Sequence, residues 1–320
     1  MSTKLSIIVP VHNTADYLPN CLDSLINQIY KDIQIIIVND HSTDESHNII
    51  EKYCNKYSNI TYILNTNKSG VGYARNIALK HIKTEYVTFL DSDDWIDSST
   101  YKKTIDYLED HPECEIAIWG ILAEQTSNNM SVSKVHYEYS NIIENRFAIR
   151  LLCKSFNYDI TISSMLGNKI FRSDFLKNNS IKFSHNLFED TLFSFITFYF
   201  AKKICLIGNT NLHYYQREGS IMHSFSDTYV DEMISVLFEI KSFLEINNAF
   251  EEYHDDYYSL LSKGLIKLID MIFSTQQNIK AQKKFLSFMF DKLTCFFSIS
   301  ELIDNMDIEI VKVFLGKQNT

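Results

Sequence analysis

The chain has 320 residues, of which 45% are hydrophobic and 22% are charged, and its formal net charge is −10. This length accommodates one α/β domain with an added region, and the core that it can bury needs no disulfide staples. The acidic balance argues against nucleic acid as the main partner, because phosphate backbones are bound by clustered lysine and arginine.

The six cysteines include no C-x-x-C pair. Their spacing argues against a zinc site or a disulfide framework, and it favours free thiols in a reducing cytoplasm. No stretch reaches about 18 uninterrupted apolar residues, so we expect no membrane-spanning helix.

Apolar runs and segments of helical period alternate through the first part of the chain. The expected strands are 5–9, 33–38, 60–64 and 86–90, and the expected helices are 17–28, 43–57 and 71–82. Strands that are apolar throughout, with a helix between each pair, indicate a parallel sheet covered on both faces. In such sheets ligands bind beyond the carboxyl ends of the strands.

The rest of the chain is more mixed and then becomes helical. The expected elements are strands at 116–122, 204–207 and 212–215, helices at 141–154 and 190–201, and helices from about 229 almost to the end. We therefore predict an α/β catalytic domain at 1–225 and a helical C-terminal region at 226–320. The predicted domain has a nucleotide-binding half at about 1–122 and an acceptor half at about 123–225.

The strongest chemical feature is the sequence Asp91-Ser92-Asp93-Asp94 at the end of the fourth strand. Three carboxylates in four residues repel one another, so a cation is their natural partner. Mg²⁺ and Mn²⁺ take carboxylate oxygens and readily share phosphate oxygens. The alternative is an acidic turn in which an aspartate or serine caps the next helix.

Two further motifs follow other strands. Asp40 ends the second strand, where its carboxylate could accept a hydrogen bond from a base edge, although a helix cap is the more frequent role of such a residue. Gly70 and Gly72 permit a tight start to a helix, and Arg75 falls one turn into it. Arg75 could reach an anion, and a structural salt bridge is an equal alternative.

The later part of the chain has two motifs of its own. Asp190, with the preceding glutamate, opens an apolar helix, where it could act as a general base or cap the helix. Arg217 and Ser220 could hold a diphosphate. His213 or His223 could complete a metal shell, although a lone histidine is more often not a ligand.

Taken in order, these motifs resemble the family 2 glycosyltransferases of bacterial surface-polysaccharide synthesis, which have the GT-A fold. The resemblance covers about residues 4–224. It rests on Ser6 to Asn13, Val38 to Asp44, Gly72 to Asn76, Phe89 to Trp95, Asn168 to Phe171, Phe188 to Thr191 and Tyr214 to Ile221.

The resemblance implies an inverting, metal-dependent transferase that uses Mn²⁺ or Mg²⁺, with Asp190 as the catalytic base. The residues that it implies for the nucleotide sugar are Pro10, Val11, Asn13, Asp40, Arg75, Asp91, Ser92, Arg217 and Ser220. Those considered for the metal are Asp93, Asp91 and His213. Two departures stand out, since His12 occupies a usual tyrosine position and His41 a usual glycine position.

The expected reaction moves a sugar from a nucleoside-diphosphate sugar, usually a UDP-sugar, to a hydroxyl of a glycan acceptor. The product would belong to a cell-surface polysaccharide or lipooligosaccharide. The alternative is a metal-dependent nucleotidyltransferase or phosphatase that uses the aspartate cluster directly. A non-catalytic binding protein is a third hypothesis.

The predicted helical region carries two wide apolar faces, at 260–273 and 285–297. Packing on the catalytic domain is the favoured interpretation. The alternatives are a homodimer or an amphipathic membrane contact, for which Lys280, Lys283 and Lys284 offer a thin basic flank. We expect a cytoplasmic protein, with the inner face of the membrane as a second location if the helices bind lipid.

Overall fold

The computed structural model describes residues 3–125, 130–154, 160–216, 226–275 and 278–306. The chain divides into two compact units. The first contains residues 1–148 and 160–217, and the second contains residues 149–159 and 218–320. The predicted domain limit at 225 falls outside the described residues.

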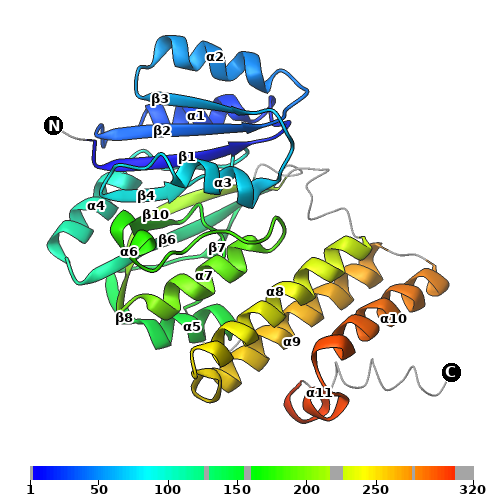
Figure 1. The fold of residues 1–320 in the computed structure, drawn as a ribbon. Helices are drawn as coiled ribbons and strands as arrows, with labels where there is room; N and C mark the ends of the chain where they lie inside the picture. Colours follow the sequence, from blue (N-terminus) through cyan, green and yellow to red (C-terminus); the bar gives the residue numbers. More distant parts are fainter. Residues whose placement is uncertain (1–2, 126–129, 155–159, 217–225, 276–277, 307–320) are drawn as a thin grey trace. The chain divides into compact units, whose positions relative to one another are not determined.

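The first unit is built on a mixed sheet of ten strands in the described part of the chain, in the order β3-β2-β1-β4-β9-β6-β10-β5, with β7 on β6 and β8 on β10. The strands are β1 (Leu5–Val11), β2 (Ile33–Asp40), β3 (Ile60–Asn65), β4 (Tyr86–Phe89), β5 (Trp95–Ile96), β6 (Cys114–Gln125), β7 (Met130–Val135), β8 (Asn141–Glu144), β9 (Lys169–Arg172) and β10 (Lys203–Gln216). Strands β1 to β4, β6 and β10 run in one direction. The predicted α/β class with a mostly parallel sheet is confirmed (Figure 1).

The helices of this unit follow the strands. They are α1 (Leu18–Ile26), α2 (Ser46–Lys56), α3 (Val71–Leu79), α4 (Thr100–Asp110), α6 (Ser173–Asn178) and α7 (Glu189–Phe200), while α5 (Asn145–Cys153) passes from the first unit into the second. In α1 the buried residues Leu18, Cys21, Leu22 and Leu25 recur at helical spacing, so one face packs inward. A proline in the first turn suits this helix because its first N–H groups have no partner within the helix.

Several elements differ from the prediction. The segment predicted as one helix at 141–154 begins as strand β8, because Asn141–Glu144 pairs with the first residues of β10. The two strands predicted at 204–207 and 212–215 form the single strand β10, whose register shifts between Ile207 and Asn211. Asn209 has a φ of 54° at this irregularity. Strands β5, β7 and β9 are short or polar, so their apolar pattern is too brief to identify from the sequence.

The first four strands place their carboxyl ends at one edge of the sheet. Strand β1 pairs in parallel with β2 and β4, and β2 pairs in parallel with β3. The register sets Val11 beside Asn39 and Asp40 beside Asn65. The polar residues that follow these strands therefore lie on one side of the first unit, as expected for a ligand site in an α/β sheet.

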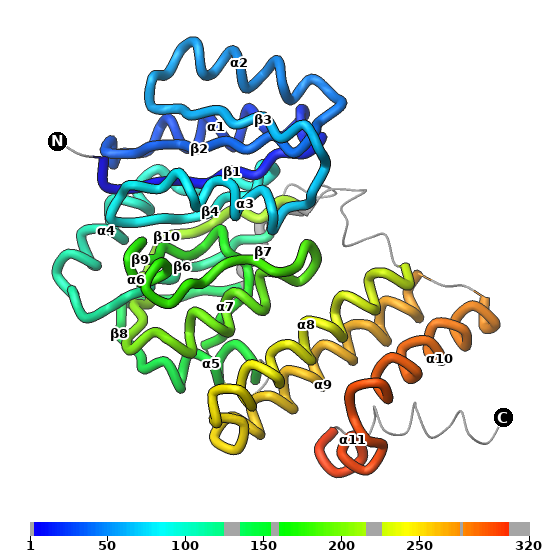
Figure 2. Tube along the Cα trace, viewed as in Figure 1, coloured from blue at the N-terminus to red at the C-terminus, as the bar shows by residue number. Residues whose placement is uncertain are grey.

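The second unit consists of α8 (Asp227–Ile246), α9 (Phe250–Thr275), α10 (Ile279–Phe296) and α11 (Ile299–Asn305), with the end of α5. Helices α8 and α9 lie side by side (Figure 2), where an added Cβ on Gly264 would lie 3.1 Å from a Leu237 methyl group. The buried Asp256 of α9 lies 3.7 Å from Arg150 and 3.5 Å from Lys154. Over the described residues, no helix is long and apolar enough to cross a membrane.

Candidate functional site

The acidic turn after β4 is divided between buried and accessible carboxylates. Asp94 is buried, and its Oδ1 accepts the backbone N–H of Tyr215 at 3.1 Å. Ser92 is also buried and accepts a hydrogen bond from the Thr14 hydroxyl at 2.8 Å. Asp91 is more accessible, with 45% of its side chain exposed. The turn is therefore anchored through Ser92 and Asp94, and Asp91 can meet a ligand.

Arg75 connects this turn to a segment more than a hundred residues away. Its Nη2 lies 2.6 Å from Asp91 Oδ1, and its Nη1 lies 2.5 Å from Glu189 Oε1. The guanidinium is 3% exposed. Burial opposes its charge, but Asp91 and Glu189 outweigh burial and raise the pKa of Arg75. Arg75 thus joins the end of β4 to the start of α7. This contact is the structural salt bridge that the sequence offered as an alternative.

Glu189 is the buried member of this bridge. Burial raises the pKa of Glu189 to about 7, the charge of Arg75 opposes that shift, and the charge of Asp190 adds to it. Removal of Arg75 would leave a carboxylate in the interior without its cation. Such uncompensated burial is costly, so the bridge depends on all of its members.

The glycines before Arg75 serve a close approach of two backbone segments. An added Cβ on Gly72 would collide with the carbonyl oxygen of His185, and one on Gly70 would collide with the Asn186 side chain. Gly70 also has a φ of 93°, a conformation that favours glycine. The glycine pattern therefore positions the segment that leads into α7.

That segment is tied to α3 at a second point. The Asn76 side chain donates to the Phe183 carbonyl at 2.8 Å and accepts the Phe183 N–H at 3.0 Å. Phe188, with a φ of 57°, then turns the chain so that α7 begins at Glu189. Long-range contacts thus fix the place where the predicted base begins its helix.

Asp190 lies in the first turn of α7 and is partly exposed. Its Oδ2 accepts a hydrogen bond from the Ser164 hydroxyl at 2.9 Å, and its Oδ1 accepts the Thr191 N–H at 2.7 Å. A helix N-terminus favours negative charge. The geometry therefore offers an oriented, accessible carboxylate.

Tyr214, near the end of β10, is influenced electrostatically by carboxylates of both segments. Burial raises the pKa of Tyr214, and the charges of Asp94, Asp93, Asp91 and Asp190 raise it further. These four side chains are therefore close enough to act on one phenol. The acidic turn and the predicted base belong to one negatively charged region.

Asp40 is 3% exposed and is held by the loop before α3. Its carboxylate accepts hydrogen bonds from the Asn65 side chain, the Ser69 N–H and hydroxyl, and the Gly70 N–H, at 2.6 to 3.2 Å. The carboxylate of Asp40 thus fixes the path of this loop, a contact that was not among the roles considered from the sequence. His41 has a φ of 60°, which explains why glycine would ease this turn.

The first two loops are linked to each other at the sheet edge. The Asn13 side chain accepts the Thr43 N–H at 2.7 Å, and the Asn13 N–H donates to the Ser42 hydroxyl at 3.1 Å. Pro10 and Val11 are buried in β1. These residues therefore build the edge at which the base was predicted to lie.

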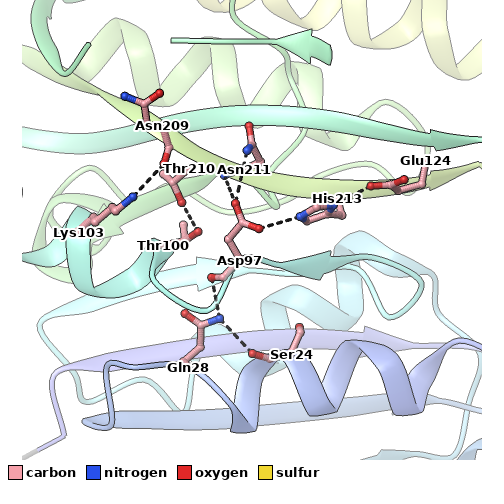
Figure 3. A network of polar contacts seen from close by, with 10 residues as sticks. All are labelled: Ser24, Gln28, Asp97, Thr100, Lys103, Glu124, Asn209, Thr210, Asn211 and His213. Atoms are coloured by element: carbon pink, nitrogen blue, oxygen red, sulfur yellow. Dashed lines mark hydrogen bonds and ion pairs between the residues drawn. The ribbon is translucent and has the colours of Figure 1, made fainter. Parts of the chain in front are cut away.

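His213 lies in a network that differs from a metal shell (Figure 3). One ring nitrogen is 2.9 Å from Asp97 Oδ1, and the other is 2.7 Å from Glu124 Oε1. Burial lowers the pKa of His213, but the two carboxylates outweigh burial and raise it. The ring also stacks on Trp95 with centroids 5.3 Å apart. Because a metal ligand needs a free lone pair, this arrangement does not support the predicted metal role of His213.

No group of three or more His, Cys, Asp or Glu side chains among the described residues is arranged to hold a metal ion. The remaining candidates are Asp91 and Asp93, to which phosphate oxygens would have to be added. The predicted residues Arg217, Ser220 and His223 lie outside the part of the chain that the structure describes.

Four residues of this region were not chosen as site residues from the sequence: Ser164, Lys169, Glu189 and Tyr214. Lys169 and Tyr214 lie in segments that carry the family resemblance, and Glu189 directly precedes Asp190, so these three had a usable signal. Ser164 had none, because its contact with Asp190 depends on tertiary structure.

The family model described as glycosyl transferase family 2 matches residues 6–175. A poly(ribitol-phosphate) beta-glucosyltransferase of Bacillus spizizenii is 32% identical over 68% of this chain and 33% of its own length. The poly(ribitol-phosphate) beta-N-acetylglucosaminyltransferase TarS of Staphylococcus aureus is 30% identical over 79% of this chain and 42% of its own length. The chain thus spans less than half the length of these relatives, although it spans 72% of EpsH of Bacillus subtilis.

A crystal structure of TarS in complex with UDP-GlcNAc superposes with a TM-score of 0.71 at 25% identity, over 92% of this chain and 82% of that chain. This similarity agrees with the predicted GT-A fold. The family match covers more than half of the chain and includes the glycine-led helix and the acidic turn. The chain belongs to glycosyl transferase family 2.

Proposed function

We propose that this chain is an inverting glycosyltransferase that moves a sugar from a UDP-sugar to a hydroxyl of a glycan acceptor. The acceptor would belong to a cell-surface polysaccharide or lipooligosaccharide. The observation that carries the proposal is the Arg75 bridge, which brings Asp91 of the acidic turn and Glu189 beside Asp190 into one site. The relatives whose names give poly(ribitol-phosphate) transfer, and the TarS complex with UDP-GlcNAc, support this choice of donor and acceptor class.

Asp190 would act as the general base. Its carboxylate would accept the proton of an acceptor hydroxyl while that oxygen forms a bond to the anomeric carbon. The bond from the anomeric carbon to the diphosphate breaks in the same step, and the electron pair leaves with the nucleoside diphosphate. This single displacement inverts the anomeric configuration, as in inverting glycosidases with an acceptor alcohol in place of water. The hydrogen bonds from Ser164 and the Thr191 N–H support a fixed orientation for the base.

Asp93 and Asp91 would hold Mn²⁺ or Mg²⁺ in this proposal. The residues fit such a cation in kind, because hard divalent ions take carboxylate oxygens and share phosphate oxygens. The gathering of Asp91, Asp93, Asp94 and Asp190 around Tyr214 supports a place for positive charge. A bound cation would supply charge that neutralises the departing diphosphate.

The nucleotide would lie along the sheet edge formed by Pro10, Val11, Asn13 and Asp40. Because Asp40 already accepts hydrogen bonds from the loop before α3, we propose that it shapes this edge as well as facing the base. Ser92, bound to Thr14, would help to shape the neighbouring wall. Arg217 and Ser220 would hold the diphosphate, as the family resemblance implies.

The domain assignment is part of the proposal, with residues 1–225 as the catalytic region and 226–320 as a helical region. A second copy or a membrane surface as the partner of the C-terminal helices stays a prediction. So does a location at the inner face of the membrane.

The proposal is tested with the purified chain and a panel of UDP-N-acetylglucosamine, UDP-glucose and UDP-galactose. We expect UDP release from at least one donor in the presence of Mn²⁺, and its loss when EDTA removes the metal. Asp190→Asn should retain UDP affinity by calorimetry within about twofold and lose about 10²- to 10⁴-fold in turnover, the usual contribution of a general base.

Turnover by Asp190→Asn at the wild-type rate would disprove the assigned base. Thermal shift supplies the test against a non-catalytic binding protein, because a ligand that binds only the folded state raises the midpoint of unfolding. If no nucleotide stabilises the chain with or without metal, the transferase proposal fails.

A further inference from the structure

The segment before β9, residues 160–168, is anchored by a buried lysine. The Lys169 ammonium donates to the Ser163 carbonyl at 2.7 Å, to the Met165 carbonyl, and to the Asn168 side-chain oxygen at 3.0 Å. Lys169 is 0% exposed. Three donors on the ammonium thus meet three oxygens of one short segment, which fixes its path.

The same segment is anchored at two further points. The Asn168 side chain donates to the Trp119 carbonyl at 2.6 Å, so the segment is attached to β6. The Ser194 hydroxyl donates to the Ser164 carbonyl at 2.9 Å, so it is also attached to α7. Ser164 is therefore held through its backbone on the same helix that carries Asp190.

The Ser164 hydroxyl points at the predicted base. Its Oγ donates to Asp190 Oδ2 at 2.9 Å, while the Thr191 N–H occupies the other carboxylate oxygen. One oxygen of Asp190 is thus held by the helix itself, and the other is held by a side chain from a different segment. A carboxylate whose two oxygens are both held has a fixed plane. A fixed orientation is the condition for a well-aimed base.

Lys169 is unusual because its ammonium donates to the neutral oxygens of Ser163, Met165 and Asn168. Burial lowers the pKa of Lys169 to about 7, and the charge of Asp190 opposes that shift. The ammonium therefore lies within electrostatic range of the base without touching it. The proposed transfer step uses no contact between this lysine and the substrate. We therefore assign the role of Lys169 to the segment that its ammonium holds.

We propose that Ser164 is a positioning residue for Asp190, and that Lys169 holds the 160–168 segment so that the Ser164 hydroxyl meets that carboxylate. This inference rests on the proposed function, because it assigns a role relative to the general base. It adds that a second segment of the chain, residues 160–168, orients the carboxylate of the base.

Ser163 provides a matched control in the same segment. Its hydroxyl accepts the Met165 N–H at 3.2 Å, a hydrogen bond within the segment that does not involve Asp190. Ser163→Ala and Ser164→Ala therefore make the same chemical change at neighbouring positions. Ser164→Ala removes the hydrogen bond to Asp190, whereas Ser163→Ala removes a hydrogen bond within the segment. Comparing the two variants therefore separates an effect on the orientation of the base from an effect on the stability of the segment.

The test measures UDP release from UDP-N-acetylglucosamine, UDP-glucose and UDP-galactose with Mn²⁺, together with UDP affinity by calorimetry. We expect Ser164→Ala to lower kcat about tenfold, the scale of one hydrogen bond to a charged group, with the donor KM and the UDP affinity within about twofold of wild type. Ser164→Thr, which keeps the hydroxyl, should recover most of the rate. Ser163→Ala should stay within about twofold of wild type.

Lys169→Met should lower kcat at least as much as Ser164→Ala, and the two losses should not add in the double variant, because both act through one contact. If Lys169→Met does not fold, the serine pair still decides the question. A wild-type kcat in Ser164→Ala, an equal loss in Ser163→Ala, or a failure of Ser164→Thr to recover the rate would overturn the inference.

Asp190→Asn is measured beside these variants to separate this inference from the proposed function. If Asp190→Asn is inactive and Ser164→Ala is unaffected, the positioning role is wrong and the base stands. If Asp190→Asn retains full turnover, the assigned base is wrong, and the role of Ser164 falls with it.

Discussion

Two regions of the first unit meet at the site, and they are built in opposite ways. The strand-end edge, which comprises Asn13, Asp40 and Asp91 to Asp94, arises from consecutive parallel strands whose last residues are polar. The base segment, which comprises residues 160–169 and 183–191, is held by contacts with α3, β6 and its own helix α7. The edge is thus formed by strands that follow one another in the chain, whereas the orientation of Asp190, the proposed base, depends on contacts with distant segments.

The two regions also differ in how their carboxylates are stabilised. At the strand-end edge, Asp40 and Asp94 accept hydrogen bonds from backbone or hydroxyl donors. In the base segment, the buried carboxylate of Glu189 is paired with the buried guanidinium of Arg75. The edge should therefore tolerate single changes better than the bridge that joins the two regions.

The largest expected effect comes from breaking that bridge. Arg75→Met removes the cation between Asp91 and Glu189, and it leaves a buried carboxylate without a partner. We expect a loss of about 3–5 kcal/mol in the free energy of unfolding. We also expect UDP release to fall by more than the loss of folded protein explains, as measured by urea titration and by turnover per folded molecule. An Arg75→Met variant with wild-type stability would show that the two regions do not depend on this residue.

A smaller effect is expected from the approach of α3 to the base segment. Gly72→Ala places a methyl group against the His185 carbonyl, which is backbone and can move only with its segment. We expect a loss of about 1–3 kcal/mol in stability, with reduced turnover.

Gly264→Ala is the matched control in α9. There the added methyl group meets the Leu237 side chain, which can change rotamer. Stability should stay within about 1 kcal/mol of wild type, since alanine also favours the helix. Equal effects on turnover from both variants would contradict the link between Gly72 and the base.

The pH dependence of turnover should sharpen the comparison further. Burial raises the pKa of Glu189 to about 7, so the side chain is charged and paired with Arg75 in mild alkali. As the pH falls through about 7, Glu189 takes up a proton and the ion pair weakens, so kcat should decline on the acid side. Glu189→Gln, which cannot titrate, should lack this limb. An unchanged acid limb in that variant would assign it to another group.

The smallest effect is expected at His213. Because Asp97 and Glu124 hold both ring nitrogens, His213→Asn should leave the Mn²⁺ concentration for half-maximal UDP release within about twofold of wild type. A tenfold weaker response to Mn²⁺ would restore the metal role predicted from the sequence.

The sequence predicted the first unit's sheet edge well because apolar strands and their polar ends lie next to each other in the chain. Asp91 to Asp94 could be recognised from four letters, and the family resemblance extended that recognition to Asp190. Ser164 could not be found in this way, since its hydroxyl meets Asp190 only after folding. Strand β8 was missed for a related reason, because its four residues are stabilised by pairing with β10.

His213 shows another limit of the sequence. It was considered as a metal ligand because a histidine can complete a metal shell, whereas in the structure its two ring nitrogens face Asp97 and Glu124, from two other segments. The sequence could not reveal these partners, because neither lies near His213 in the chain. Arg75 had two possible roles from the start. The structure shows its ion pairs with Asp91 and Glu189, and its contact with a nucleotide sugar stays a prediction.

The most direct test is a crystal structure of Asp190→Asn with Mn²⁺ and the UDP-sugar that the wild-type chain turns over. The account predicts that the diphosphate lies beside Asp91 and Asp93, and that residue 190 faces the anomeric carbon from the side opposite the diphosphate. A donor sugar bound away from Asp91, or one whose diphosphate lies on the same side as residue 190, would contradict it.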